Sequence, residues 1–157
     1  VKQPVLMDKL RLTVSSLEGW CGAQDQSPKV AVAALNPHGG EEGMLGREEI
    51  EEISPAIAQL QEEGLVVVGP YPADSIFYRA TAGEFDAVQA LYHDQGHIAV
   101  KVHNFEDSIT ATMGIPFVRT SVDHGTAFDI AGLNKANENG LLRALDAAVD
   151  MVNGTLT

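Results

Sequence analysis

The sequence predicts an α/β fold with a largely parallel sheet. Short apolar runs rich in valine, isoleucine and alanine alternate with segments whose apolar residues recur at helical spacing. This alternation is typical of parallel strands joined by helices. Polar turns follow several of the apolar runs directly. Because open α/β sheets bind ligands at the carboxyl ends of their strands, these turns are the candidate functional segments.

The overall composition limits the classes of function. The chain has 157 residues, of which 45% are hydrophobic, and a net charge of −12. It is long enough for one domain with a hydrophobic core. An acidic chain lacks the basic surface that nucleic acids and anionic membranes attract, so neither is an expected partner. No apolar run approaches the ~20 residues of a membrane span. The lone cysteine, Cys21, agrees with a reducing, cytoplasmic location.

Two amphipathic helices and a buried strand are predicted before residue 65. Apolar residues at helical spacing predict helices over about 6–19 and 47–63. Pro55 should kink or interrupt the second helix, and Gly64 should end it. The run at 29–35 predicts a buried strand of a parallel sheet. The acids of the second helix are expected mostly to face water: Glu48, Glu49, Glu51, Glu52, Glu62 and Glu63.

The rest of the chain predicts four further strands and four helical segments. The strands cover 65–68, closed by Gly69-Pro70, and 85–91, 108–113 and 117–122, of which the last two could pair antiparallel. The helical segments cover 73–80 with Phe77 facing inward, 95–103 beginning beside His93, 126–131, and a final helix capped by Asn137 or Asn139.

Three histidines lie just beyond predicted strands: His38, His93 and His124. Imidazole is a common ligand of Zn²⁺ and Co²⁺, and catalytic metal sites use about three protein ligands and one open position. The chain has neither an HExxH nor a CxxC motif, so these histidines would have to converge through the fold. His93 is our first candidate for a metal ligand. The alternative, that these are loop histidines without a metal, remains open.

Lys101 and Arg119 are the candidates for binding an anionic substrate. Lys101 lies about two helical turns beyond His93. Arg119 lies in an apolar, strand-like run, where an unpaired charge is costly. It should therefore either bind a phosphate or carboxylate, or form an ion pair with Asp94 or Asp123. The residues alone do not decide between these two interpretations.

Six motifs resemble those of 4-hydroxythreonine-4-phosphate dehydrogenase, the PdxA family of the pyridoxal-phosphate (pyridoxine biosynthesis) pathway. They are ALNPHGGE (34–41), GREEI (46–50), GPYPAD (69–74), YHDQG (92–96), IPFVRTSVDHGTAFDIAG (115–132) and KAN (135–137). The resemblance runs from about residue 29 to the end of the chain. It extends to the related D-threonate and D-erythronate 4-phosphate dehydrogenases.

This resemblance implies an isocitrate/isopropylmalate dehydrogenase-like α/β/α fold and a specific reaction. The reaction is the NAD-dependent oxidation, with decarboxylation, of a phosphorylated four-carbon hydroxy acid such as 4-phosphohydroxy-L-threonine. A divalent metal (Zn, Co or Mg) and a homodimer that shares the metal site are also implied. The implied residues are Lys101 and Asp94 for catalysis; Lys101, Thr110 and Arg119 for substrate; His124, Asp129 and Asn137 for NAD; and His38 and His93 for metal. An acid beside the ribose, here Asp129, would favour NAD over NADP.

The chain departs from the family pattern at Thr110 and in length. Thr110 stands where the family has an asparagine, and a hydroxyl cannot copy both ends of an amide. This favours the D-threonate/D-erythronate branch. Family members are also much longer, so the chain resembles their C-terminal half. The expected parts are 1–28, an N-terminal helix and linker; 29–115, the central α/β dimerisation domain; and 116–157, a segment that returns to the first, cofactor-binding domain.

Two other interpretations stay open. The chain could be an inert, dimeric half-domain, because no histidine precedes His38 to complete a three-histidine metal site. A phosphate acyltransferase of similar architecture is the third possibility, although the histidine motifs argue against it.

Overall fold

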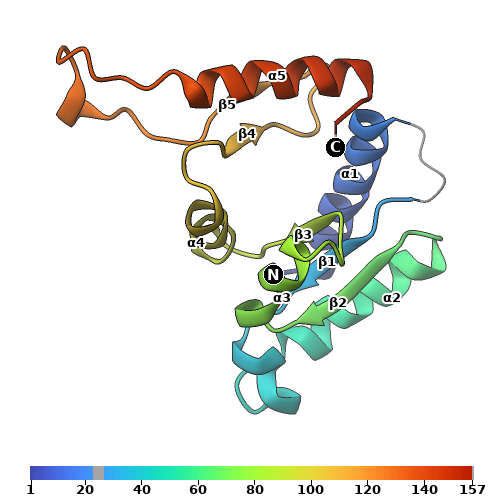
Figure 1. Ribbon diagram of the computed structural model, residues 1–157. Helices are drawn as coiled ribbons and strands as arrows, with labels where there is room; N and C mark the ends of the chain where they lie inside the picture. The colour runs from blue at the N-terminus through green and yellow to red at the C-terminus, as the bar shows by residue number, and fades with distance from the viewer. Residues whose placement is uncertain (23–26, 157) are drawn as a thin grey trace.

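The computed structural model describes residues 1–22 and 27–156 and contains two sheets joined by helices (Figure 1). Residues 23–26 of the expected linker lie outside the described part. The helical elements are α1 (Gln3–Cys21), η1 (Pro37–Gly43), η2 (Glu49–Ile53), α2 (Ser54–Glu62), α3 (Ala73–Thr81), α4 (His93–His103), η3 (Phe128–Ile130) and α5 (Asn139–Asn153). The strands are β1 (Val30–Ala33), β2 (Val67–Tyr71), β3 (Ala87–Gln89), β4 (Ile109–Ala111) and β5 (Thr120–Val122).

The larger sheet is parallel, as the sequence predicts. Its strand order is β2-β1-β3, so β1 lies in the middle and pairs with both neighbours. Val30 and Val32 of β1 pack against α1 and α2, whereas Ala31 and Ala33 pack against Ile76 of α3. A strand that is covered on both faces must be apolar throughout, which explains the sequence VAVA. The α/β/α layering that the family resemblance implies is confirmed (Figure 1).

Two predictions about the segment 47–63 need correction. The segment is not one α-helix: it begins with the π-helical turn η2, and α2 starts at Ser54. Pro55 lies at the start of α2, where its missing N–H is tolerated. Glu49 does not face water but is only 4% exposed. It lies four residues before the buried Ile53, so both side chains share the inner face.

Other boundaries differ by a few residues. Helix α1 begins at Gln3 rather than near residue 6, with Pro4 in its first turn. Strand β2 does not stop before Gly69-Pro70 but continues to Tyr71. Gly69 has φ 119°, and a Cβ there would lie 2.7 Å from the backbone oxygen of Val32, so only glycine fits between these strands. In α3 the fully buried residue is Ile76, and Phe77 is half-buried beside it.

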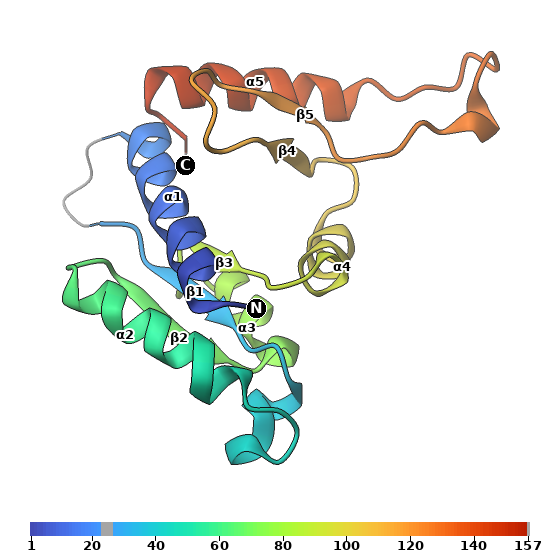
Figure 2. The ribbon, with the colours of Figure 1, turned by 180° about the vertical axis from the view of Figure 1, so that it is seen from behind.

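The second sheet is the antiparallel hairpin β4–β5, as the sequence predicts. Figure 2 shows α5 lying along this hairpin, and α1 contacts both halves of the structure through α2 and α5. The hairpin spans the boundary expected between residues 115 and 116. Helix α5 begins at Asn139 with Glu138 at its N-cap, and its cap has no side-chain hydrogen bond. Asn137 instead accepts a hydrogen bond from the Asn139 N–H.

Large apolar side chains remain exposed on two helices. On α5 they recur at helical spacing and form a stripe along one face, namely Leu141, Leu145, Val149 and Val152. On α4 they are Ile98, Val100 and Val102. Within residues 1–22 and 27–156, no helix combines the length and apolar composition that a membrane crossing needs.

Candidate functional site

His38 lies in the tight turn that follows β1. The backbone of this turn is left-handed at His38 (φ 53°), Glu41 (φ 45°) and Glu42 (φ 55°), which is unusual for residues other than glycine. The His38 side chain is 66% exposed, and its Nδ1 lies 2.7 Å from Glu41 Oε1. Its Nε2 is therefore the nitrogen that remains for a ligand.

His93 is the first residue of α4 and not part of the loop before it, which corrects the helix boundary predicted at Gln95. Its side chain is 74% exposed, and Nδ1 lies 2.8 Å from Oδ1 of Asp94. The imidazole of His97 stacks on that of His93, with ring centroids 4.1 Å apart and planes inclined by 8°. His93 thus presents a ring whose orientation is fixed on one side by Asp94 and on one face by His97.

The carboxylate of Asp123 accepts hydrogen bonds from Lys101 and from two nearby hydroxyl groups. The Lys101 Nζ donates to Asp123 Oδ2 at 2.9 Å and to the backbone oxygen of Asp123 at 3.0 Å. Ser108 and Thr110 donate to the same carboxylate, each at 3.3 Å. The hydrogen bond from Lys101 holds the pKa of Asp123 below its usual range and outweighs the opposite effect of burial. This cluster joins α4 to the β4–β5 hairpin.

Arg119 does not form the ion pair that the sequence left open. Its Nη1 donates to Thr112 Oγ1 at 3.0 Å, and within the described ranges it is paired with neither Asp94 nor Asp123. Asp123 binds Lys101 instead. Arg119 is exposed, one residue before β5, and so carries a cation that is available to an anion in solution.

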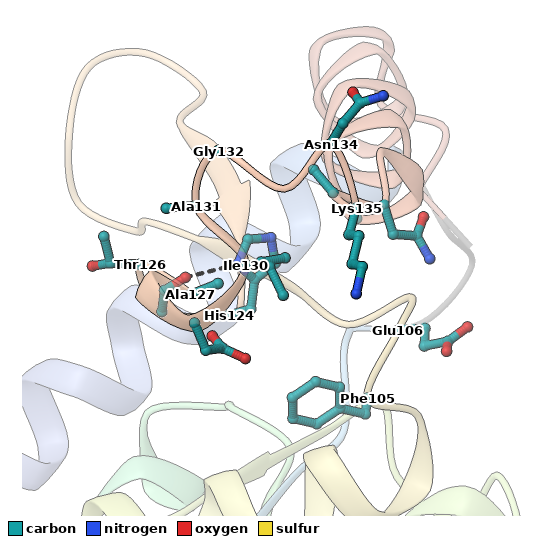
Figure 3. Close-up of a pocket in the computed structure, with 15 residues that line it drawn as sticks. Phe105, Glu106, His124, Thr126, Ala127, Ile130, Ala131, Gly132, Asn134 and Lys135 are labelled. Atoms are coloured by element: carbon teal, nitrogen blue, oxygen red, sulfur yellow. Dashed lines mark hydrogen bonds between the residues drawn. The ribbon is translucent and has the colours of Figure 1, made fainter.

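A pocket of about 1010 Å³ lies beyond the hairpin (Figure 3). All three residues expected to contact NAD line it: His124, Asp129 and Asn137. Figure 3 shows Phe105 and Glu106 on one side of this space, with Lys135 pointing into it from the segment before α5. His124 Nδ1 lies 2.9 Å from the Gly125 backbone oxygen, and because a carbonyl oxygen only accepts, Nδ1 is the donor of this hydrogen bond and Nε2 is the ring nitrogen left for a ligand. The size and the mixed donors and acceptors suit a nucleoside portion of a cofactor.

The expected metal ligands do not form a complete site within one chain. Among the described residues, no group of three or more histidine, cysteine, aspartate or glutamate side chains is placed to hold a metal ion. His38 and His93 each offer one imidazole nitrogen, which is the right donor chemistry. Among the described residues, no third side chain of this kind joins these two imidazoles.

The family is settled by comparison with known proteins. A family model described as "Pyridoxal phosphate biosynthetic protein PdxA" matches residues 1–148.

The chain belongs to the PdxA family.

Similar curated proteins and solved structures agree with this membership. A Symbiobacterium thermophilum protein, provisionally named D-threonate 4-phosphate dehydrogenase, is 58% identical over 75% of this chain and 35% of its own length. The 4-hydroxythreonine-4-phosphate dehydrogenase of Neisseria meningitidis is 44% identical over 99% of this chain and 47% of its own. The crystal structure of that enzyme from Klebsiella pneumoniae has a TM-score of 0.83 and 39% identity, covering 96% of this chain and 45% of that one. The chain therefore spans less than half of these PdxA-family proteins.

Sequence reasoning missed three organising residues of the site. Glu49 and Gln95 are buried polar side chains, and Asp123 pairs with Lys101 rather than with Arg119. The spacing of Glu49 to Ile53 was a usable signal, because it places the acid on the apolar face. Gln95 and Asp123 gave no comparable signal, since their partners lie on distant segments.

Proposed function

We propose that the natural protein carrying this chain is a metal- and NAD-dependent dehydrogenase of a phosphorylated four-carbon hydroxy acid. The observation that carries the proposal is the junction at Asp123 and His124. Asp123 binds Lys101 and Thr110, the expected substrate residues, while the next residue, His124, lines the expected cofactor pocket. A substrate beside Lys101 and a cofactor whose nucleoside portion lies in the pocket would therefore bind to adjoining residues, and the nicotinamide ring would have to extend from the pocket toward the substrate for hydride transfer.

The proposed roles follow from the chemistry of each side chain. Arg119 would bind the phosphate or carboxylate, because guanidinium is suited to planar, two-point recognition of anions. Lys101 and Asp94 would exchange protons with the hydroxyl and with the product of decarboxylation. Thr110 would orient the substrate through its hydroxyl. NAD, lying against His124, Asp129 and Asn137, would accept the hydride. A divalent metal held in part by His38 and His93 would supply Lewis-acid stabilisation of the developing carbonyl.

The substrate we favour is D-threonate 4-phosphate or its D-erythronate analogue. Thr110 replaces the asparagine of the 4-hydroxythreonine-4-phosphate enzymes, and its hydroxyl already donates to Asp123. Four relatives provisionally named for D-threonate 4-phosphate are 50–61% identical over 66–81% of this chain. Two named for 4-hydroxythreonine 4-phosphate are 49% and 44% identical over 92% and 99% of it. 4-Phosphohydroxy-L-threonine remains the alternative substrate.

A homodimer and a cytoplasmic location complete the proposal. Ile98 and Val102 are exposed apolar residues of α4, the helix that begins with His93. A second copy covering this face would bring its own histidine-bearing turn toward the incomplete metal site, so that the site is shared. We also propose that residues 29–115 form the dimerisation domain and 116–157 the returning part of the cofactor domain, after the N-terminal helix and linker of 1–28.

The test is a comparison of substrates with the natural protein. NADH formation is measured with NAD, Co²⁺ and each of D-threonate 4-phosphate, D-erythronate 4-phosphate and 4-phosphohydroxy-L-threonine. The proposal expects the highest kcat/KM with one of the first two. Preference for the third would correct the substrate, and absence of NADH with all three would contradict the function.

The alternative is an inert half-domain, since residues 1–22 and 27–156 bring no three metal-binding side chains together. Titration of the 157-residue chain with Co²⁺ discriminates between the two. Tight binding, with the absorption bands of imidazole-bound Co²⁺, would count against inertness. Absence of binding by a folded, dimeric chain would support it.

A further inference from the structure

Two buried polar side chains meet at the carboxyl end of β1. Among the described residues, Glu49 and Gln95 are the polar or charged residues with the least exposure, at 4% and 8%. They come from η2 and α4, two elements that both follow β1 in the sequence and lie far apart from each other along it. Both bind the backbone of the three residues that follow β1, namely Ala34, Leu35 and Asn36. Burying polar groups is costly unless they are fully paired, so their shared target calls for an explanation.

Glu49 holds the start of the turn that carries His38. Its Oε1 accepts hydrogen bonds from the Leu35 and Asn36 backbone N–H groups, both at 2.8 Å. Its Oε2 accepts from the Asn36 side-chain amide at 2.9 Å. Burial raises the pKa of Glu49, but these hydrogen bonds outweigh burial and leave the pKa lowered. The carboxylate therefore stays charged and saturates three donors at the base of the turn.

The surrounding backbone is folded tightly around this carboxylate. A Cβ on Gly40 would lie 2.9 Å from Glu49 Oε2, and a Cβ on Gly46 would lie within 2.5 Å of the Asn36 side chain. Both glycines therefore allow the turn to close onto Glu49 and Asn36. One acid is thus hydrogen-bonded to the start of the His38 turn and lies close against Gly40 within it, without touching His38 itself.

Gln95 ties the helix that begins with His93 to the same place. Its Nε2 donates to the Ala34 oxygen at 2.7 Å, and its Oε1 accepts from the Leu91 N–H at 2.8 Å. Gln95 lies two residues after His93, in the first turn of α4. The first turn of α4 is thereby bound to Ala34, the residue that directly precedes the two whose N–H groups Glu49 binds.

We propose that Glu49 and Gln95 are positioning residues that fix the His38 turn and the His93 helix on the end of β1. The inference rests on the proposed function, in which these two histidines bind a metal. Both imidazoles are largely exposed, so their own contacts do little to set where their backbones lie. Catalytic constellations need their supports held to within about 0.5 Å, and buried hydrogen bonds to backbone groups supply such support.

The test uses Glu49→Gln in the natural protein, with Glu51→Gln as its matched control. The Glu51→Gln substitution is the same chemical change in the same helical turn, but Glu51 is exposed and paired with Arg47. In Glu49→Gln the new amide N–H₂ meets the Asn36 amide, so one buried hydrogen bond is lost. We expect backbone amide exchange at residues 35 and 36 to become faster and Co²⁺ affinity to fall about tenfold, the lower end of the effect of removing outer supports of metal ligands. The control should change neither.

A compensating variant separates positioning from general destabilisation. The Asn36 side-chain amide also donates to Glu48 Oε2 at 2.6 Å, so the compensating variant must change both acids. Asn36→Asp combined with Glu48→Gln and Glu49→Gln gives each new amide an acceptor, and should recover slow exchange and most of the Co²⁺ affinity. Gln95→Met, which keeps the volume but loses both hydrogen bonds, should likewise weaken Co²⁺ binding. All measurements are made well below the thermal midpoint of each variant.

The outcomes are distinct for the two proposals. Unchanged exchange at residues 35 and 36 in Glu49→Gln overturns the positioning inference, as does unchanged Co²⁺ affinity when exchange is faster. If the unaltered protein binds no Co²⁺, the proposed metal function fails instead. In that case the exchange rates alone decide whether Glu49 fixes the turn.

Discussion

The ammonium of Lys101 is bound to the carboxylate of Asp123, with Nζ 2.9 Å from Oδ2. Asp123 is 9% exposed and Lys101 is 33% exposed, so the pair is partly removed from water. The positive charge of Lys101 is therefore balanced inside the protein before any substrate arrives. Arg119, which makes no ion pair among the described residues, is a cation that an anionic substrate can neutralise.

Arg119→Gln should weaken binding of the phosphorylated substrate more than it slows turnover. A charge-assisted hydrogen bond contributes about 1.5–3 kcal/mol, so KM should rise roughly 10- to 100-fold. Steady-state kinetics measure this change. Arg11→Gln is the control, because Arg11 pairs with Glu63 on a distant surface. An unchanged KM in Arg119→Gln would assign the anion to another residue.

Asp123 should contribute stability that depends on pH. Its pKa is lowered in the folded state, chiefly by Lys101. Its contribution is therefore fully present above the unfolded pKa of about 4 and is lost as pH falls through the lower folded pKa. The difference in the free energy of unfolding between the unaltered protein and Asp123→Asn should be largest near neutral pH and shrink below about pH 4. Urea titrations across this range measure it, with the exposed Asp8→Asn as control. A difference that does not vary with pH would contradict the role of the charge.

His93→Ala should lose bound metal and turnover together. The comparison variant is His103→Ala at the other end of α4. Metal content after gel filtration and the rate of NADH formation are the two measurements. Metal retained at unaltered affinity would refute the assignment of His93. Lys101→Ala should show the opposite pattern, keeping the metal while losing substrate binding and rate.

Asp129→Asn should relax the preference for NAD over NADP. Asp129 lines the pocket of about 1010 Å³, and a carboxylate near the adenosine ribose repels a 2′-phosphate. Removing one charge should raise kcat/KM with NADP about tenfold relative to NAD, which corresponds to roughly 1.4 kcal/mol. The measurement is the ratio of kcat/KM with NADP to kcat/KM with NAD, compared between the unaltered protein and Asp129→Asn. An unchanged ratio would place the ribose away from Asp129.

The sequence was sufficient to predict the layering of the fold and the order of its elements. Apolar periodicity is set by burial, and β1 is buried on both faces as its composition requires. The antiparallel pairing of β4 with β5 also followed from two β-branched runs around a short turn. The family motifs predicted His124, Asp129 and Asn137 as cofactor contacts, and these three residues line one pocket.

The supports of the site could not be predicted in the same way. Glu49 lies among several acids on one helix, and only the packing of the turn after β1 selects it for burial. Gln95 reaches a backbone oxygen 61 positions away in sequence, and Lys101 reaches an acid 22 positions away. Such partners depend on how the chain folds back, which periodicity and spacing do not encode.

The most direct test of the account is the dependence of NADH formation on divalent metal. The natural protein is assayed with NAD and its preferred phosphorylated four-carbon acid, before chelation, after chelation, and after addition of Co²⁺. The account predicts that NADH forms, that chelation abolishes it, and that Co²⁺ restores it. NADH formation that continues unchanged in the chelated protein, or no NADH before chelation, would contradict a metal- and NAD-dependent dehydrogenase.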